Sequence, residues 1–174
     1  VIPILSQFKR INPDVISLAF DPEGSGPDTH YKVLQAIAEA LREWQKEKDI
    51  SNLRVIGYRN VWYRFNVEEA NVIVPVSQNE ITLMDNIFSN SYASQVEASF
   101  PSYEMDGKFS TLSQKIWDEQ MSDIVYLTGK DYFYQNLDPK LRACHGLVYM
   151  KEMSVEEFLT HARSLEKSTE GQID

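Results

Sequence analysis

The segment from Asp21 to His30 contains the residues of this sequence that are best suited to chemistry. Its sequence, Asp-Pro-Glu-Gly-Ser-Gly-Pro-Asp-Thr-His, places carboxylates at Asp21, Glu23 and Asp28 and an imidazole at His30. Carboxylate oxygens and a neutral imidazole are good ligands for zinc and similar ions, and glycines let the backbone approach a ligand closely. These residue types indicate a ligand or metal site, with His30 as the candidate metal ligand.

A purely structural role for this segment is also open. Asp28 or Thr29 is suited to cap a helix, and Asp, Pro and Gly are ordinary loop residues. The pattern Gly24-Ser25-Gly26 does not match a dinucleotide fingerprint, because that motif needs a third glycine where the sequence has Thr29. On residue chemistry alone, a solvated or capping His30 therefore stands beside the ligand role.

The predicted elements around this segment are a strand, a loop, a helix and a second strand. Residues 15–20 and 53–58 are short apolar runs bounded by loop residues, which is typical of buried strands. Between them, apolar residues recur at helical spacings, namely at Val33, Ile37, Leu41 and Trp44. This periodicity predicts an amphipathic helix over residues 28–48 and hence a βαβ unit. Ligands of such parallel sheets bind outside the carboxyl ends of the strands, where the Asp21 segment lies.

The rest of the chain completes a single predicted α/β domain. Further apolar runs predict strands at residues 71–76, 123–128 and 147–151. Capping boxes predict helices that open at Ser77, Thr111 and Ser154 and run to about residues 97, 120 and 167. Because neither a repeat nor a linker is visible, we predict one domain over residues 1–167 and a frayed tail at residues 168–174.

Composition and charge exclude several classes of partner. The 26 acidic and 17 basic residues give a net charge of −9, which disfavours nucleic acid and offers no attraction to an anionic membrane. The sequence contains no apolar run of about 18 residues that could cross a bilayer. A single cysteine, Cys144, cannot form an internal disulfide, which favours a reducing, cytoplasmic location. Because the chain starts at Val1, we expect a processed protein or a piece of a longer one.

Residues 10–100 resemble the PIG-L/LmbE family of zinc-dependent de-N-acetylases. In that family a strand ends in a glycine-rich turn, and a His-Pro-Asp-His segment opens the next helix, with its final histidine bound to zinc. His30 matches this metal ligand, and Asp28 matches the carboxylate of the motif, to which we assign the catalytic role. The segment Ser91-Tyr92-Ala93-Ser94-Gln95 is similar to the family's helix ending in His-x-Ser-Gln, with Tyr92 in the histidine position.

The resemblance implies a Rossmann-like, LmbE-type sheet, mostly parallel and flanked by helices, that lacks its N-terminal strands. The sequence departs from the family at Gly26, which replaces the first histidine, and at Thr29, an additional residue before His30. The family's Pro-His-Pro-Asp-Asp motif, with the other zinc ligands and the general base, is absent, and no other histidine precedes His30. We therefore expect zinc in a full-length parent protein, and no hydrolase activity from this chain alone.

The same stretch is similar to the C-terminal extension of some bacterial glucosamine-6-phosphate deaminase/isomerase-like proteins. This similarity implies an amino sugar or a sugar phosphate as ligand, in a cleft that Asp21, Glu23, Gly26 and Arg59 line. A sheet edge left by the missing strands leads us to expect a homo-oligomer. The alternative is a non-catalytic domain that binds a sugar or a partner subunit.

Two other residues and one segment are weaker candidates. Cys144 precedes His145, but adjacent residues rarely address one reacting atom, so a buried structural thiol is the favoured interpretation. His161 is predicted to lie on the polar, surface side of the last helix. The aromatic and arginine residues at 58–65 border the predicted cleft, although simple packing against the core is favoured for them.

Overall fold

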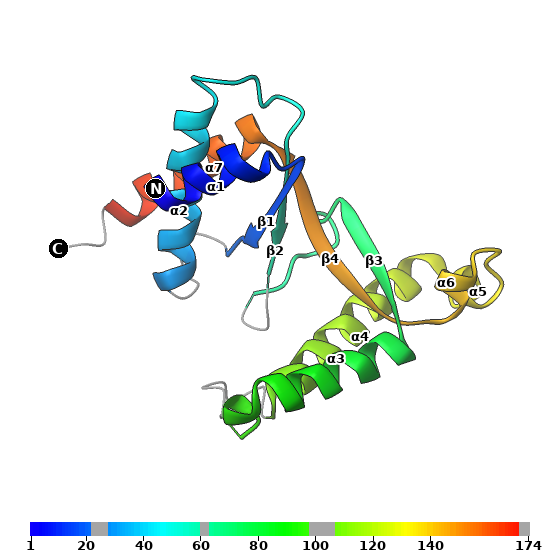
Figure 1. Ribbon diagram of the computed structural model, residues 1–174. Helices are drawn as coiled ribbons and strands as arrows, with labels where there is room; N and C mark the ends of the chain where they lie inside the picture. Colours follow the sequence, from blue (N-terminus) through cyan, green and yellow to red (C-terminus); the bar gives the residue numbers. More distant parts are fainter. Residues whose placement is uncertain (22–27, 60–62, 98–106, 171–174) are drawn as a thin grey trace. The chain divides into compact units, whose positions relative to one another are not determined.

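The computed structural model describes residues 1–21, 28–59, 63–97 and 107–170 (Figure 1). The chain forms two compact units, the first comprising Val1–Tyr63 and Met150–Asp174 and the second Arg64–Tyr149. The strands have the order β1-β2-β4-β3 in a mixed sheet, so the fold is α/β as predicted. Strand β4 (Cys144–Ser154) contributes residues to both units.

The first unit contains the predicted βαβ arrangement. Its elements are, in chain order, α1 (Ile2–Ile11), β1 (Val15–Ala19), α2 (Asp28–Trp44), β2 (Arg54–Tyr58), the end of β4, and α7 (Val155–Glu170). Strands β1 and β2 are parallel, with Ala19 opposite Tyr58. Strands β2 and β4 are antiparallel, with Tyr58 opposite Met150. The carboxyl ends of β1 and β2 therefore lie at the same edge of the sheet.

Helix α2 packs against α7 through the apolar face that its periodicity predicts. Ile37, Leu41 and Trp44 are buried as expected, whereas Val33 is 47% exposed and Leu34 takes its place. On α7, Phe158 and Ala162 have no exposed surface. The side-chain amide of Gln35 on α2 donates to the backbone carbonyl of Ala162 at 2.8 Å. Burial of each large apolar side chain stabilises this unit by about 1.5–3 kcal/mol.

Helix α1 covers residues to which the sequence pattern assigned no element. It begins with Pro3 in its first turn and ends at Asn12, whose φ of 52° is in the left-handed region. Proline is tolerated at a helix start and asparagine at a left-handed end, so both ends follow from residue type. The ring of Phe8 packs on that of Trp44, with 5.5 Å between their centroids, which attaches α1 to the core.

The second unit is mainly helical. Its elements are, in chain order, β3 (Val72–Ser77), α3 (Gln78–Ser91), the short 3-10 helix η2 (Ala93–Gln95), α4 (Phe109–Thr128), α5 (Asp131–Tyr134), α6 (Pro139–Arg142) and the start of β4. The capping box predicted at Ser77 is confirmed, because Ser77 and Glu80 bond each other's backbone amides. The helix after it ends at Ser91 rather than near residue 97.

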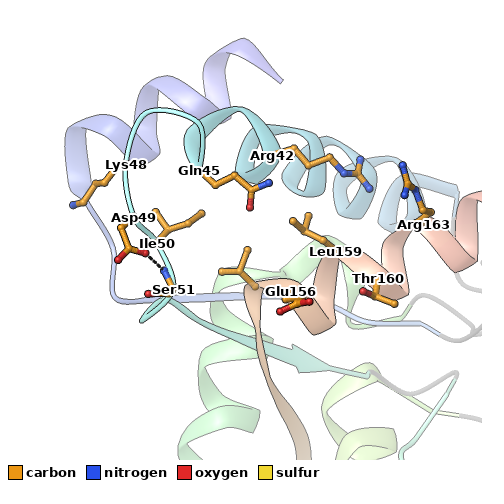
Figure 2. Close-up of a pocket in the computed structure, with 11 residues that line it drawn as sticks. Arg42, Gln45, Lys48, Asp49, Ile50, Ser51, Glu156, Leu159, Thr160 and Arg163 are labelled. Atoms are coloured by element: carbon orange, nitrogen blue, oxygen red, sulfur yellow. Dashed lines mark hydrogen bonds between the residues drawn. The ribbon is translucent and has the colours of Figure 1, made fainter.

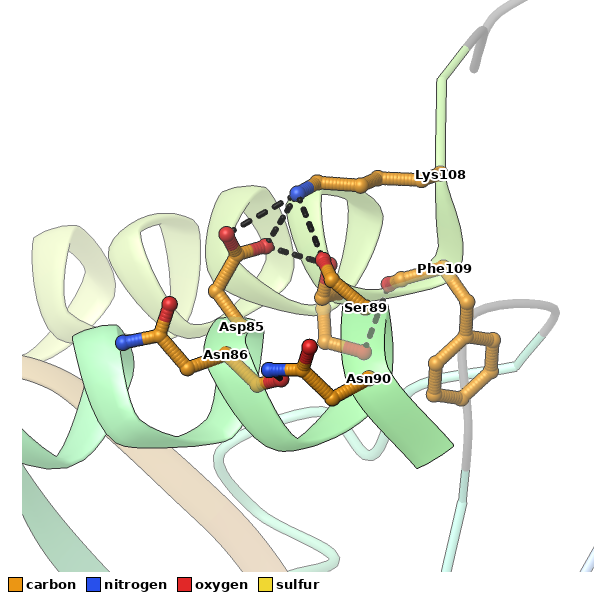
Figure 3. Close-up of polar contacts among 8 residues, drawn as sticks. Asp85, Asn86, Ser89, Asn90, Lys108 and Phe109 are labelled. Carbon is orange, nitrogen blue, oxygen red and sulfur yellow. Dashed lines mark hydrogen bonds and ion pairs between the residues drawn. The ribbon is translucent and has the colours of Figure 1, made fainter. Parts of the chain in front are cut away.

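An ion pair joins α3 to the start of α4 (Figure 3). The Lys108 ammonium lies 2.7 Å from one oxygen of Asp85, and the fully buried Ser110 donates to the same carboxylate at 2.6 Å. These hydrogen bonds lower the pKa of Asp85, Lys108 acting most strongly and Ser110 next. Asp85 therefore stays charged and holds the two helices together.

The strand predicted at residues 123–128 is wrong, because those residues form the end of α4. The run Ile124-Val125-Tyr126-Leu127 has high strand propensity, but nothing interrupts the helix before Gly129, whose φ of 81° ends it. The predicted cap at Thr111 is also wrong, since α4 starts at Phe109 and has no side-chain cap. Even this 20-residue helix is not apolar enough to cross a membrane, and neither is any other helix within the described ranges.

Candidate functional site

The structure brings Asp21 and His30 together at the carboxyl end of β1. Asp21 follows this strand by two residues, and His30 lies in the first turn of α2. One carboxylate oxygen of Asp21, Oδ2, lies 2.6 Å from Nδ1 of His30. Asp21 is buried, with 5% of its side chain exposed, whereas 29% of the His30 side chain is exposed. The pair therefore has a buried carboxylate and an imidazole that reaches the surface.

This contact orients the imidazole of His30. When Nδ1 donates its proton to the carboxylate, the lone pair is placed on Nε2, which is the nitrogen left to contact a ligand. The same carboxylate–histidine contact orients metal-binding histidines and histidines that act as bases. The second oxygen of Asp21, Oδ1, is buried and has no hydrogen-bond partner within the described residues. The pair is thus a polar group at the edge of the core whose hydrogen-bonding capacity is incompletely used.

Asp28 lies on the surface at the start of α2. Its carboxylate pairs with Lys32 at 2.5 Å, one turn along the helix, and its side chain is 73% exposed. Its position in the first turn is favourable for the helix dipole. The carboxylate that contacts His30 is that of Asp21.

The other predicted cleft residues are Arg59, Glu23 and Gly26. Arg59 follows the end of β2, and its Nε donates to the backbone carbonyl of Phe20 at 3.1 Å. Because Phe20 directly precedes Asp21, Arg59 lies beside the Asp21–His30 pair. Glu23 and Gly26 lie outside the described residues.

His161 is not the surface residue that the sequence analysis predicted. Its ring packs on Phe20, with centroids 4.1 Å apart, and its Nε2 atom is buried without a partner in the described part of the chain. Burial lowers the pKa of His161 most strongly, and the charges of Lys151 and Arg59 lower it further. The signal for this burial was present in the sequence, because Phe158, His161, Ala162 and Leu165 follow the spacing of a core-facing helix stripe.

The described residues include one candidate metal-binding histidine and no complete zinc centre. His30, with Asp21 behind it, has the donor chemistry of a metal-binding histidine. A catalytic zinc needs about three protein ligands and an open position. Among the described residues, no group of three or more His, Cys, Asp or Glu side chains is placed to hold a metal ion. For this reason no reaction step through zinc follows from these residues.

A pocket of about 640 Å³ lies elsewhere in the first unit (Figure 2). It is bounded by the end of α2, the turn that precedes β2, and the first half of α7, with Ile50, Val155 and Leu159 among its lining residues. Arg42 and Arg163 stand at one end of it and Asp49 at the other (Figure 2). Since β2 starts after this turn, the pocket is at the amino end of β2, and none of the predicted site residues lines it.

The remaining candidates belong to the second unit. Cys144 is buried, in agreement with the structural interpretation, and its thiol donates to the carbonyl of Gly146 at 3.0 Å. His145 is exposed, with Nδ1 3.0 Å from the carbonyl of Ala143. Tyr92 follows the last residue of α3 and is 58% exposed.

The chain matches no protein-family model, no curated protein and no solved structure. The geometry of the residues described above is therefore what supports a function.

Proposed function

We propose that this chain is a cytoplasmic, LmbE-type α/β domain that binds an amino sugar or sugar phosphate at the carboxyl end of β1. The observation that carries the proposal is the contact between the buried Asp21 carboxylate and His30, 2.6 Å long. This pair lies where open α/β sheets bind ligands, between a strand end and a helix start. The parent protein is related to zinc-dependent hydrolases of N-acetylated amino sugars and to glucosamine-6-phosphate isomerase/deaminase proteins.

The pair acts on its ligand through Nε2 of His30. With Nδ1 bound to Asp21, Nε2 accepts a hydrogen bond from a sugar hydroxyl or ammonium group. In a complete zinc centre the metal would supply an activated water for attack on an amide. Among the described residues one imidazole is available at this place, fewer than the ligands that a catalytic zinc needs, so we expect binding of the ligand without hydrolysis.

Binding is tested by titration of glucosamine into the protein, followed by NMR. Saturable shifts of the amide signals of residues 28–32 are expected, and His30→Gln should abolish them while the variant remains folded. His145→Gln is the matched control, because this histidine is exposed and lies in the second unit. Equal affinity in the wild type and His30→Gln would contradict the proposal.

Hydrolysis is tested separately, by release of acetate from N-acetylglucosamine with zinc present. No turnover above the rate without protein is expected, since the described residues provide one metal ligand at this place. Zinc-dependent turnover that His30→Gln removes would show that the chain completes a metal centre.

Exposed apolar residues favour a second candidate function, self-association through the second unit. Leu83 and Ile87 lie one turn apart on α3 and are 58% and 52% exposed. Ile73 and Val74 are also exposed on β3, the strand at one edge of the sheet. We expect a dimer of this chain by light scattering, and a monomer for Leu83→Gln/Ile87→Gln. A monomeric wild type at all concentrations tested would exclude this function.

A further inference from the structure

Three nitrogen-bearing side chains gather around Phe20, next to the Asp21–His30 pair. Gly57 of β2 lies directly under Phe20, since a Cβ at Gly57 would come within 2.7 Å of the Phe20 side chain. Lys151 of β4 is the cross-strand partner of Gly57, so its side chain leaves the same face of the sheet. His161 packs on the ring of Phe20 from α7. Phe20 thus packs on His161 and lies over Gly57, on the face of the sheet from which Lys151 extends.

Arg59 adds a second positive charge to this group. It follows Gly57 by two residues, which is the period that returns a side chain to the same face of an extended chain. Its guanidinium group contacts the carbonyl of Phe20 at 3.1 Å. Burial lowers the pKa of His161 most strongly, and the charges of Lys151 and Arg59 lower it further.

In the cluster formed by Lys151, Arg59 and His161, two side chains have polar atoms without a hydrogen-bond partner among the described residues. Lys151 is half-buried and has no ion-pair or hydrogen-bond partner within the described ranges. The adjacent carboxylate, Glu152, alternates to the other face of the sheet and pairs with Arg54 at 3.2 Å. The buried Nε2 atom of His161 likewise has no partner among the described residues. The charge of Lys151 also acts on the Glu157 carboxylate of α7, which accepts hydrogen bonds from Ser154. A half-buried ammonium group near a second cation is stabilised further by an anion that contacts both cations.

We propose that Lys151, Arg59 and His161 bind the phosphate group of a phosphate monoester whose other end reaches His30. A phosphate has several acceptor oxygens, and it can accept from an ammonium, a guanidinium and an imidazole N–H at once. Because the cluster is next to Asp21–His30, the ligand is a phosphorylated sugar rather than a neutral one. This identification rests on the proposed function, whereas the anion site itself does not.

The anion site is tested by titration with inorganic phosphate at constant ionic strength, measured by NMR. Saturable binding to the wild type is expected, with a shift of the His161 imidazole signals. Lys151→Gln should weaken binding at least about tenfold. Lys167→Gln is the matched control, because Lys167 is an exposed lysine of α7 and its loss changes the net charge equally. It should bind within about twofold of the wild type.

Two further variants separate a binding role from a folding role. Lys151→Arg keeps the charge and should retain phosphate binding, and His161→Gln should weaken it while Lys151 is intact. The inference is overturned if the wild type binds no phosphate, or if Lys151→Gln and Lys167→Gln bind equally. Glucosamine distinguishes the two proposals, because its binding should depend on His30 and not on Lys151. Phosphate binding without glucosamine binding would refute the proposed function alone.

Discussion

Replacement of Gly57 by alanine tests how the core positions the candidate site. The added Cβ would lie 2.7 Å from Cβ and 2.8 Å from Cγ of Phe20. Carbon atoms in contact prefer about 3.5–4.0 Å, so Phe20 must move by roughly 1 Å. Overpacking of this kind costs about 1–3 kcal/mol. Because Phe20 contacts His161 and Arg59, the displacement should also reach the proposed anion site.

Urea denaturation measures this cost. With a slope of about 1–3 kcal/mol per molar urea, the midpoint for Gly57→Ala should fall by roughly 1 M. If the clash with Phe20 is the cause, Gly57→Ala should cost less in a Phe20→Leu background, with a coupling energy of about 1 kcal/mol. A Gly57→Ala variant within about 0.3 kcal/mol of the wild type would refute this explanation of the glycine.

Gly146→Ala is the matched control in the second unit. A Cβ there would lie 2.9 Å from Cβ of Trp117, so a similar loss of stability is expected. Its clash does not involve Phe20, so the His161 imidazole signals should stay at their wild-type positions. If the His161 signals move in Gly57→Ala but not in Gly146→Ala, the position of Phe20 determines the position of the His161 imidazole.

Three further predictions concern titration and capping. Burial lowers the pKa of His161 in the folded protein, so the unfolded chain binds a proton at this imidazole first as the pH drops below 6.5, and stability should fall. This contribution is at most about 1.4 kcal/mol per pH unit. In a plot of the urea midpoint against pH, His161→Gln should reduce the slope and His145→Gln should not. Ser77→Ala removes the cap of α3 and should cost about 1 kcal/mol in urea denaturation, whereas Ser122→Ala on the exposed side of α4 should cost little. Burial raises the pKa of Tyr149 to about 12, so ultraviolet titration should show it ionising after the exposed tyrosines.

Local sequence patterns predicted the elements that position the site. The alternation of two short apolar runs with one amphipathic stretch correctly indicated β1, α2 and β2 in parallel arrangement. The caps at Ser77 and Ser154 were found for the same reason, since each involves residues three apart in the chain. Interactions within one turn or one strand leave a periodic signal that can be recognised without the fold.

Contacts between distant residues left no such signal. The packing of His161 on Phe20 joins two elements that are far apart in the chain. The stripe of α7 could have indicated that His161 is buried, although it was predicted to lie on the surface, but the stripe does not identify Phe20 as its neighbour. The partner of His30 is Asp21, whereas Asp28, which is nearer in sequence, pairs with Lys32. The strand expected at residues 123–128 failed because its β-branched residues continue a helix that no glycine or proline interrupts.

The most direct test of the central claim is a titration with glucosamine 6-phosphate, monitored by NMR. The wild type should bind it saturably, with shifts at both His30 and His161. His30→Gln and Lys151→Gln should each weaken binding at least about tenfold, while His145→Gln and Lys167→Gln bind like the wild type. Binding that neither His30→Gln nor Lys151→Gln changes would contradict the account.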